Sequence, residues 1–550
     1  MRLRRRYLAH FAAKDPLKYM SLCYVPWNVH TFLLFPFQIM STFTSILCAI
    51  LAAILLAYRR SRKRRLGPLP PGPQGWPLIG NLLDMPTTYH WLTFSDWSQR
   101  WGDIVSVTLL GQPMVILNSP KDAMTILEKK SAITSDRAPL PVAGDMIGWS
   151  RAMVLAPYGD RLREMRKMFA QVLASRQRFE RFHALVEGET QHFLLGLRTR
   201  TDSLVRDLHR LAGSSMVAIT YGYKVRGDDD HLIQIVDKAM ADFTEASAPG
   251  TYLADIFPFL CHIPSWVPGA QWRRKVAEQS KNFDRMADIP FNWVKAQMNA
   301  GTALPSVASA LLEGSDGPEK EELIKMASAS LYAGGADTTV AAMTSFFLAM
   351  SCFPEAQRKA QAEIDALIGN GRLPTLKDRD ALPYLNALML EVLRWIPVAP
   401  MGFPHKLSED DFLEGYFLPK GTLVVANIWN FLHDPQTYAD PMTFNPDRFV
   451  PTESKEAERD PRDFCFGFGR RRCPGIVFAE ESMFALFSMV LAVYDISKAT
   501  ENGTVVEPLM EGQGSIISHP APFGFTVTPR SDKAQALLNG LADATHALSQ

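Results

Sequence analysis

The chain of 550 residues is 47% hydrophobic and 21% charged, a globular composition that is too apolar for an intrinsically disordered protein. Its 58 Lys and Arg side chains balance 57 Asp and Glu, for a net charge of +1, so it lacks the basic excess with which nucleic-acid binders neutralise phosphates. The six cysteines are scattered without a CxxC pair, which favours reduced thiols over a disulfide framework. Nucleic acid is therefore not an expected partner.

The first predicted element is an apolar segment at residues 37–58, at the end of a stretch (19–58) that carries no Asp, Glu, Lys or Arg. At about 1.5 Å per residue it spans roughly 30 Å, the thickness of a bilayer core. It ends in six basic residues between Arg59 and Arg65, unlike the small residues that close a cleaved signal peptide. We therefore expect a transmembrane anchor after an N-terminal extension (1–36), rather than a signal peptide or a buried core helix, with the remainder of the chain in the cytosol.

A basic and proline-rich joint (59–77) follows the anchor. It holds five prolines and three glycines between residues 67 and 77, a composition that excludes a helix or a central strand. From this joint to residue 530 the sequence has no repeat, linker or low-complexity tract. We expect one large domain at 78–530 and a C-terminal tail at 531–550.

The body of the chain is predicted to be mainly α with a minor β part. The expected elements are a hairpin of strands 104–109 and 114–117, a long apolar helix at 321–352, an amphipathic helix at 354–368, a helix at 384–395 and an apolar helix at 476–493. No GxGxxG motif follows a predicted strand, so the sequence has no visible nicotinamide or flavin site of its own.

The most specific motif is Phe466–Gly475 (FGFGRRRCPG), directly before the last of these helices. Its glycines let backbone amides approach the Cys473 sulfur, its arginines add positive potential, and the N-terminus of the following helix adds its dipole. These features predict a sheltered thiolate of lowered pKa that is suited to binding iron. Alternatively, a lone cysteine in such a turn is a small buried hydrophobe.

The spacing F-x-x-G-x-R-x-C-x-G resembles the haem-binding signature of the cytochrome P-450 family. The resemblance implies that the Cys473 thiolate is the axial ligand to the iron of heme b, and that Phe466 and Arg471 belong to the cofactor site. Cys465 lies outside the motif. The implied architecture is the cytochrome P-450 fold, a triangular helical domain with a small β-rich domain, behind the transmembrane helix.

A second motif, Gly334–Thr339 (GGADTT), lies in the long helix and resembles the acid–alcohol segment of the family. Two glycines inside a helix cost about 1 kcal/mol each relative to alanine, and the approach of O₂ and a porphyrin to the backbone at Gly335 is one reason to keep them. The resemblance implies that Thr338 hydrogen-bonds the distal oxygen and that Asp337 relays protons to it. The alternative is a glycine pair used only for helix packing.

Two further segments resemble structural parts of the family. Glu391 and Arg394 form an ExxR pair on one helical face, and Arg448 lies in Phe444–Phe449 (FNPDRF), which resembles the PERF element with Asp in place of Glu. By this resemblance the three charged side chains form a buried ion network behind the cysteine loop, with a structural and not a catalytic role.

The resemblance also implies how haem propionates are held. Arg166 matches the arginine of the family's WxxxR helix, although Leu162 replaces the usual tryptophan. His405 stands where the family uses a basic side chain for the other propionate. Alternatively, it is an ordinary polar residue.

A substrate pocket is expected, by position in the family pattern, from four mostly apolar segments: 142–153, Ala333–Gly334, 398–403 and 514–517.

Together these features imply a membrane-anchored, microsomal-type haem monooxygenase that resembles fungal members of natural-product pathways. It would insert one oxygen atom of O₂ into a lipophilic small molecule, a terpenoid or an aromatic polyketide. Electrons would come from an NADPH-cytochrome P-450 reductase that docks on Arg470–Arg472. The expected location is the endoplasmic reticulum membrane, with a single span. Two alternatives are a haem-thiolate isomerase or dehydratase that needs no reductase, and a haem carrier or sensor.

Overall fold

The computed structural model describes residues 66–197, 203–227, 229–248, 250–315, 317–369, 371–514 and 516–549. Residues Gly67–Gln550 form one compact unit. The N-terminal extension, the predicted anchor at 37–58 and the basic part of the joint lie outside the described residues, so the transmembrane helix stays a prediction.

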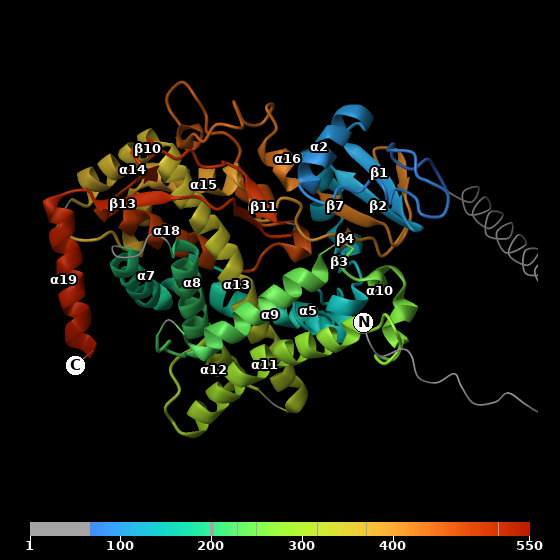
Figure 1. The fold of residues 1–550 in the computed structure, drawn as a ribbon, viewed down its shortest axis with the longest axis horizontal. Helices are drawn as coiled ribbons and strands as arrows, with labels where there is room; N and C mark the ends of the chain where they lie inside the picture. Colours follow the sequence, from blue (N-terminus) through green and yellow to red (C-terminus); the bar gives the residue numbers. More distant parts are fainter. Residues whose placement is uncertain are drawn as a thin grey trace, which may run out of the picture. The chain divides into compact units, whose positions relative to one another are not determined.

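The described chain is mainly helical (Figure 1). Its helices are α2 (His90–Trp101), α3 (Pro120–Ala123), α4 (Ser131–Thr134), α5 (Asp160–Leu173), α6 (Arg176–Phe179), α7 (His183–Leu197), α8 (Leu204–Tyr221), α9 (His231–Ser247), α10 (Leu253–Ile256), α11 (Trp272–Asn299), α12 (Val307–Leu312), α13 (Pro318–Cys352), α14 (Pro354–Leu367), α15 (Pro383–Trp395), α16 (Ile428–Leu432), α17 (Arg462–Cys465), α18 (Ile476–Val493) and α19 (Asp532–Ser549).

The strands are short. They are β1 (Ile104–Leu109), β2 (Gln112–Leu117), β3 (Asp136–Arg137), β4 (His405–Lys406), β5 (Asp411–Leu413), β6 (Tyr416–Leu418), β7 (Leu423–Ala426), β8 (Tyr494–Lys498), β9 (Thr500–Glu501), β10 (Thr504–Val505), β11 (Gly512–Gly514), β12 (Ser518–Pro520) and β13 (Phe525–Pro529).

The four predicted helices are confirmed as α13, α14, α15 and α18. The helix α13 begins at Pro318, earlier than predicted, because proline is well suited to the first helical position, where its missing N–H costs no hydrogen bond. The same applies to Pro354, which begins α14 after a bend of 104° from α13. Proline therefore marks where these helices start as well as where their predecessors end.

The predicted hairpin is confirmed as β1 and β2, which open a five-stranded sheet in the order β1-β2-β7-β4-β3. Strand β2 pairs in parallel with β7, and the remaining neighbours are antiparallel. In the register of β3 and β4, Arg137 stands opposite His405. The sheet thus brings an arginine and a histidine together from positions far apart in the sequence.

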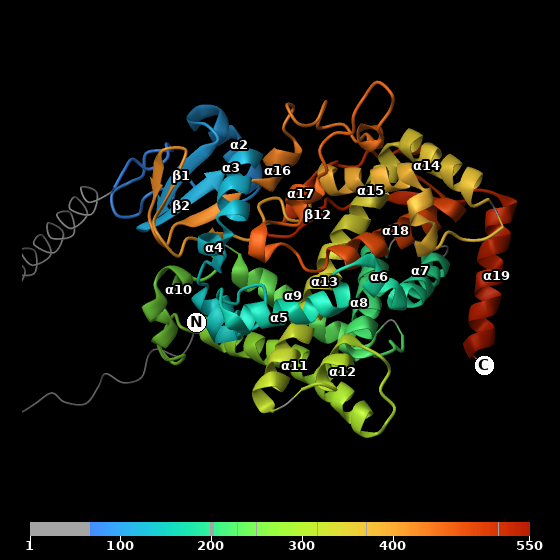
Figure 2. The same cartoon turned by 180° about the vertical axis from the view of Figure 1, so that it is seen from behind.

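The five-stranded sheet lies at one end of the compact unit, and other strands, such as β8, β12 and β13, pack among the helices. Figures 1 and 2 show β1 and β2 beside α2 at one end and α19 at the other. Helix α13 packs against α5, α8, α18 and β12, so most of its residues from Ile324 to Ser351 are buried. This buried helix carries the GGADTT motif into the core.

The proline-rich joint and the C-terminal tail both contact this unit. The Ser106 N–H of β1 donates to the Pro71 carbonyl (2.8 Å), and the Phe417 N–H donates to the Pro68 carbonyl (2.7 Å). Proline keeps its carbonyl acceptor although it lacks an N–H, so the joint lies along strands as a hydrogen-bonded edge. The tail forms α19, which packs on α7, α18 and β13 and buries Leu538.

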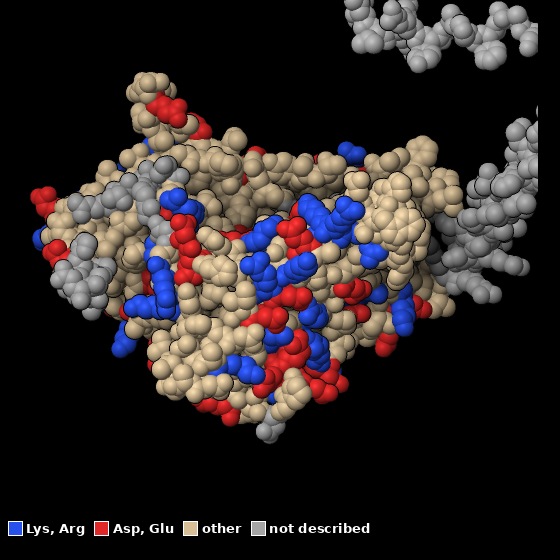
Figure 3. Space-filling view, turned by 60° about the horizontal axis from the view of Figure 1, so that its bottom comes forward, with Lys and Arg blue, Asp and Glu red and all other residues tan. Residues whose placement is uncertain are grey.

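The surface carries charges of both signs. On the face in Figure 3, basic and acidic side chains are interleaved, as the near-zero net charge predicts. Among the described helices, α18 is long and apolar enough to cross a membrane, but 78% of it is buried inside the protein. Helices α13 and α14 meet the same criterion only when taken together across their bend.

Candidate functional site

One cavity brings together most of the predicted site residues. It is lined by α13 on one side and by the cysteine loop on the other, and the predicted residues in its wall are Cys473, Phe466, Gly335, Thr338, Arg166, Arg471 and His405. Among the described residues, Asp337 does not line this cavity, although its neighbour Thr338 does.

The cysteine loop is shaped by glycines with left-handed backbone. Gly467 has φ 74° and Gly469 has φ 50°, a region that side-chain-bearing residues rarely adopt. The turn lets the Cys473 N–H donate to the Phe466 carbonyl (2.8 Å) and the Gly475 N–H donate to the Cys473 sulfur (3.4 Å). An amide donor on the sulfur is the predicted arrangement for a stabilised thiolate.

These donors alone do not lower the pKa of the thiol as predicted. Desolvation by the surrounding protein raises the pKa of the Cys473 thiol above its ordinary value, and this outweighs the lowering by the Gly475 N–H and by the charges of Arg166 and Arg472. Cys473 nevertheless has exposed surface and lines the cavity. A bound metal ion would displace the thiol proton, because coordination deprotonates a thiol outright.

Arg471 is a buried cation held by backbone carbonyls. Its Nε, Nη1 and Nη2 donate to the carbonyls of Ser135 (2.7 Å), Met153 (3.2 Å) and Ala156 (2.6 Å). Burial lowers the pKa of Arg471 to about 10. The side chain is thus fixed in the cavity wall, as the sequence predicts for the second arginine of the RRR run.

Arg137 is a cavity residue that the sequence analysis did not identify. Its Nη1 donates to the Phe403 carbonyl (2.6 Å) and the Pro404 carbonyl (3.1 Å), while its buried Nε has no hydrogen-bond partner among the described residues. Burial, reinforced by the charge of Arg471, lowers the pKa of Arg137 to about 9. A two-residue strand gives no periodic signal, so only the pairing with β4 reveals this position.

Two predicted side chains, Arg166 and His405, lie in the cavity wall together with Arg137 and Arg471. The Arg166 Nη2 donates to the Arg472 carbonyl (2.9 Å), and burial lowers its pKa. The His405 Nδ1 lies 2.8 Å from the Thr134 carbonyl. Burial and the charge of Arg137 lower the pKa of His405 to about 3, so this imidazole is neutral and not the basic group that the sequence predicts.

These side chains fit a ligand that carries carboxylates. No described residue of the cavity wall is Asp or Glu, and no described carboxylate lies within ion-pair distance of Arg137, Arg166 or Arg471. A buried cation without an anion is costly, so the cluster calls for negative charge from a bound group. The two propionates of heme b supply that charge, and Cys473 supplies a thiolate for its iron.

The helix α13 presents a hydroxyl to the cavity. The Thr338 Oγ1 donates to the Gly334 carbonyl (2.7 Å), so its remaining lone pairs can accept a hydrogen bond from the cavity side. A Cβ atom on Gly335 would lie 2.7 Å from the Met216 sulfur of α8, whereas one on Gly334 would meet no atom within 4 Å. Close packing of α8 and α13 is thus a sufficient reason for the second glycine.

Asp337 points to the other side of α13. The Nε2 of His519 lies 3.2 Å from its Oδ1, and the Nε2 of His209 lies 3.7 Å from the same oxygen. Burial raises the pKa of Asp337, but the hydrogen bond and charge of His519 and the charge of His209 outweigh it, so the pKa lies below its ordinary value. The carboxylate is therefore ionised at neutral pH.

The walls away from the cations are apolar. Each of the four predicted pocket segments contributes, with the residues Trp149, Ala152, Met153, Ala333, Gly334, Val398, Ala399, Met401, Gly402, Phe403 and Ile517. Met240 and Phe243 of α9, and Met216 of α8, line the cavity too and were missed, because an inward-facing apolar residue on an amphipathic helix is indistinguishable from core in sequence.

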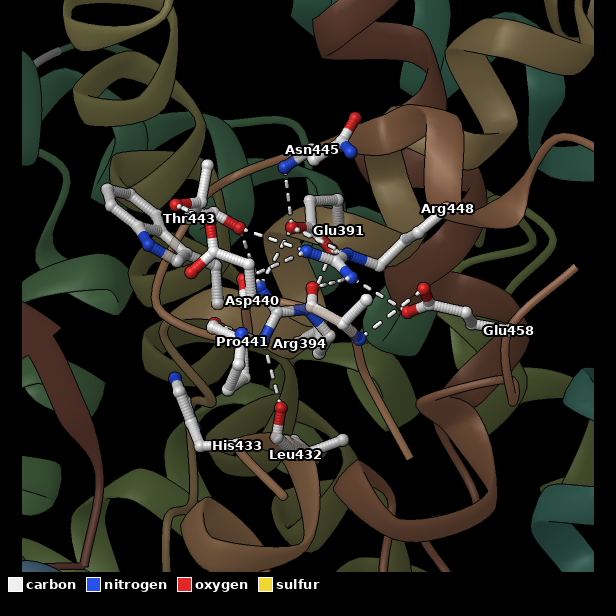
Figure 4. Close-up of polar contacts among 12 residues, drawn as sticks. Glu391, Arg394, Leu432, His433, Asp440, Pro441, Thr443, Asn445, Arg448 and Glu458 are labelled. Carbon is white, nitrogen blue, oxygen red and sulfur yellow. Dashed lines mark hydrogen bonds and ion pairs between the residues drawn. The ribbon is translucent and has the colours of Figure 1, made fainter. Parts of the chain in front are cut away.

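The ExxR pair forms the expected buried network (Figure 4). The Arg394 Nε and Nη2 donate to both carboxylate oxygens of Glu391 (2.7 and 2.8 Å), and the Arg448 Nε donates to Glu391 Oε1 (3.2 Å). Arg448 also pairs with Glu458 (2.7 Å), which the sequence analysis missed. Two cations thus meet two carboxylates, which balances the charge in a dry site.

Comparisons with known proteins agree with this geometry. The family model described as Cytochrome P450 matches residues 70–527. The chain is 50% identical to "Cytochrome P450 monooxygenase 208" of Postia placenta over 90% of this chain and 96% of that protein. It is 42% identical to "Cytochrome P450 monooxygenase claR" of Ampulloclitocybe clavipes (91% and 93% covered) and 37% identical to "Cytochrome P450 monooxygenase ppsD" of Aspergillus oryzae (91% and 96% covered).

A cavity with a cysteine on one side, a hydroxyl-bearing helix on the other and a cluster of unpaired cations defines a haem-thiolate site. The chain belongs to the cytochrome P450 family and is a haem-dependent monooxygenase. The predicted family, cofactor and enzyme class are confirmed.

Proposed function

We propose that this monooxygenase oxidises an uncharged lipophilic small molecule, a terpenoid or an aromatic polyketide, with O₂ and electrons from an NADPH-cytochrome P450 reductase. The observation that carries this proposal is the division of the cavity wall. Its charged side chains are Arg137, Arg166 and Arg471, with the neutral imidazole of His405 beside them, and the rest of the wall is apolar or small. An apolar wall selects a substrate by shape and area, and it offers no counter-ion to a charged one.

Bound haem supplies the activation of O₂ at thiolate-ligated iron. In this proposal Cys473 is that ligand, with the Gly475 N–H on its sulfur. Arg137, Arg166 and Arg471 bind the propionates, and His405 joins them once a carboxylate beside it compensates for its burial. Phe466 covers the sulfur side of the cavity wall.

Thr338 and Asp337 handle protons in this proposal. Because the Thr338 hydroxyl hydrogen is engaged by the Gly334 carbonyl, its oxygen is oriented to accept a hydrogen bond from the cavity. Asp337 occupies the adjoining position on the side of α13 that faces away from the cavity and passes protons toward Thr338.

The reductase is proposed to dock near the cysteine loop. Arg470 and Arg472 are exposed there, while Arg471 is buried. Exposed positive charge attracts an acidic electron donor and speeds its association. The proposed location is the endoplasmic reticulum membrane, with the span at residues 37–58 and the catalytic domain in the cytosol.

The test is a reconstitution of the full chain with an NADPH-cytochrome P450 reductase in microsomes that are given terpenoid and aromatic polyketide panels under ¹⁸O₂. We expect NADPH-dependent products that each gain one ¹⁸O atom, and none when the reductase is omitted. Turnover without NADPH or reductase would instead indicate an isomerase or dehydratase. Deleting residues 1–65 should release the protein from membranes and leave haem binding intact.

A further inference from the structure

The Asp337 carboxylate is held between two imidazoles on the side of α13 that faces away from the cavity. His519 comes from β12 and His209 from α8, and the Nε2 atoms of both lie against the same carboxylate oxygen, at 3.2 and 3.7 Å. The side chains of His519 and His209 are 31% and 28% exposed, against 20% for Asp337. The imidazoles thus have more contact with solvent than the carboxylate that they flank.

Residues 337 and 338 lie on opposite sides of the cavity wall. Thr338 faces the cavity, and the preceding residue, Asp337, faces away from it toward α8, α9 and β12. Ile517, two residues before His519, lines the cavity as well. The short segment 517–519 therefore contacts both the substrate space and the proton-relay carboxylate.

The electrostatic surroundings of this group come from four elements. His209 of α8, Asp237 of α9, Asp337 of α13 and His519 of β12 interact with one another. Burial, with the charge of Asp337, raises the pKa of Asp237, and the charge of His209 lowers it in part. The Glu511 carboxylate, before β11, accepts a hydrogen bond from the Tyr89 hydroxyl (3.1 Å).

We propose that His519 and His209 are positioning residues of the proton supply. Both hold Asp337 between them, and His519 exchanges with solvent the protons that Asp337 passes toward Thr338. This inference rests on the proposed role of Asp337 in proton relay. The His209 Nδ1 is buried and has no hydrogen-bond partner among the described residues, so we assign His209 a holding role and the exchange with solvent to His519.

The proton balance closes over one turnover. An imidazolium Nε2–H gives its proton to the Asp337 carboxylate, and the neutral imidazole takes a proton from solvent water or buffer. The carboxylic acid then releases the same proton to the cavity side of α13 and returns to carboxylate. No net charge accumulates on the protein, and each proton that the monooxygenase reaction consumes comes from solvent.

The test compares the product rate and the solvent isotope effect of the wild-type protein with those of histidine variants. His519→Gln keeps an N–H donor toward Asp337 but cannot carry a proton. In His209→Gln/His519→Gln we expect a product rate about tenfold lower and a larger solvent isotope effect than in the wild type. His231→Gln, an exposed histidine at the start of α9, is the control and should behave as wild type.

A second measurement needs no turnover. A double-mutant cycle of His519→Gln and Asp337→Asn, read as thermal unfolding midpoints of the haem-loaded protein, isolates their interaction. The two changes should be non-additive, because the His519 Nε2 lies 3.2 Å from the Asp337 carboxylate.

A double variant with the wild-type product rate and isotope effect, or a cycle without non-additivity, overturns the proposal. A failure of the proposed function looks different. In that case the wild-type protein itself forms no NADPH-dependent product, while the unfolding cycle still reports the His519–Asp337 interaction.

Discussion

The backbone of Gly335 lies against the Met216 thioether, so that a Cβ atom at residue 335 would stand 2.7 Å from the sulfur. Gly335→Ala should gain about 1 kcal/mol of helix propensity but lose about 1–3 kcal/mol to overpacking. We expect a net loss of unfolding free energy, measured by denaturant titration of the haem-loaded protein. Because Met216 is buried, Met216→Ala also costs stability, and the double variant should lose less than the sum of the two single variants. Full stability of the single variant would contradict the packing role.

The two cysteines of the cavity should differ sharply. Cys473→Ala should abolish the red-shifted ferrous–CO absorption band of a thiolate-ligated haem, and Cys465→Ala should keep it. The reason is that, of the two sulfurs, it is that of Cys473 which accepts the Gly475 N–H. An intact band in Cys473→Ala would refute the assignment of the ligand.

The buried cations should control haem retention. Arg137→Met removes a cation that no described carboxylate compensates, so the propionates lose a charged partner. Haem transfer to an acceptor apoprotein should become about tenfold faster or more. Arg470→Met removes an exposed arginine of the cysteine loop and should leave the transfer rate unchanged. Equal rates for the two variants would exclude Arg137 from the cofactor site.

Two threonines of α13 allow a matched test of proton handling. Thr338 and Thr344 both donate to the carbonyl four residues earlier (2.7 and 2.8 Å), but only Thr338 is among the described cavity residues. Thr338→Ala should keep haem content and NADPH oxidation while product per NADPH falls and hydrogen peroxide rises. Thr344→Ala should keep wild-type coupling. Unchanged coupling in Thr338→Ala would place the relay elsewhere.

His433 should make the protein sensitive to mild acid. Burial and the charge of Arg394 lower its pKa to about 3, and its Nδ1 lies 2.8 Å from the Trp429 carbonyl. A histidine that stays neutral in the folded state gives its full stability above about pH 6.5 and loses it as the pH falls toward 3. Between pH 7 and pH 5 the loss is about 2 kcal/mol.

His433→Gln should flatten this part of the stability curve, measured as unfolding free energy at the two pH values. His231→Gln, at an exposed position, should not. If both variants follow the wild-type curve, another group is responsible for the acid sensitivity.

The sequence predicts the long regular elements and the cysteine loop well, and for physical reasons. Helices α13 and α18 have apolar runs bounded by proline or glycine, and the spacing of the FGFGRRRCPG motif is local. Arg137 is not predicted because its partner His405 is distant in sequence. Glu458 lies only ten residues after Arg448, but it is outside every described helix and strand, so no periodic pattern indicates the pair. The sequence does not predict the direction of the Cys473 pKa shift for a different reason, because desolvation of the thiol depends on the whole fold.

The hairpin of β11 and β12 places Ile517 in the cavity wall and His519 on Asp337, with one residue between them. Any insertion, deletion or bulky exchange that reshapes the pocket at this hairpin also displaces the partner of the carboxylate. The substrate range of this enzyme and the efficiency with which it uses electrons are therefore evolutionarily linked. Directed evolution toward new substrates should produce variants that oxidise NADPH without forming product when it targets this hairpin. It should avoid such variants when it targets Met240 and Phe243 of α9 instead.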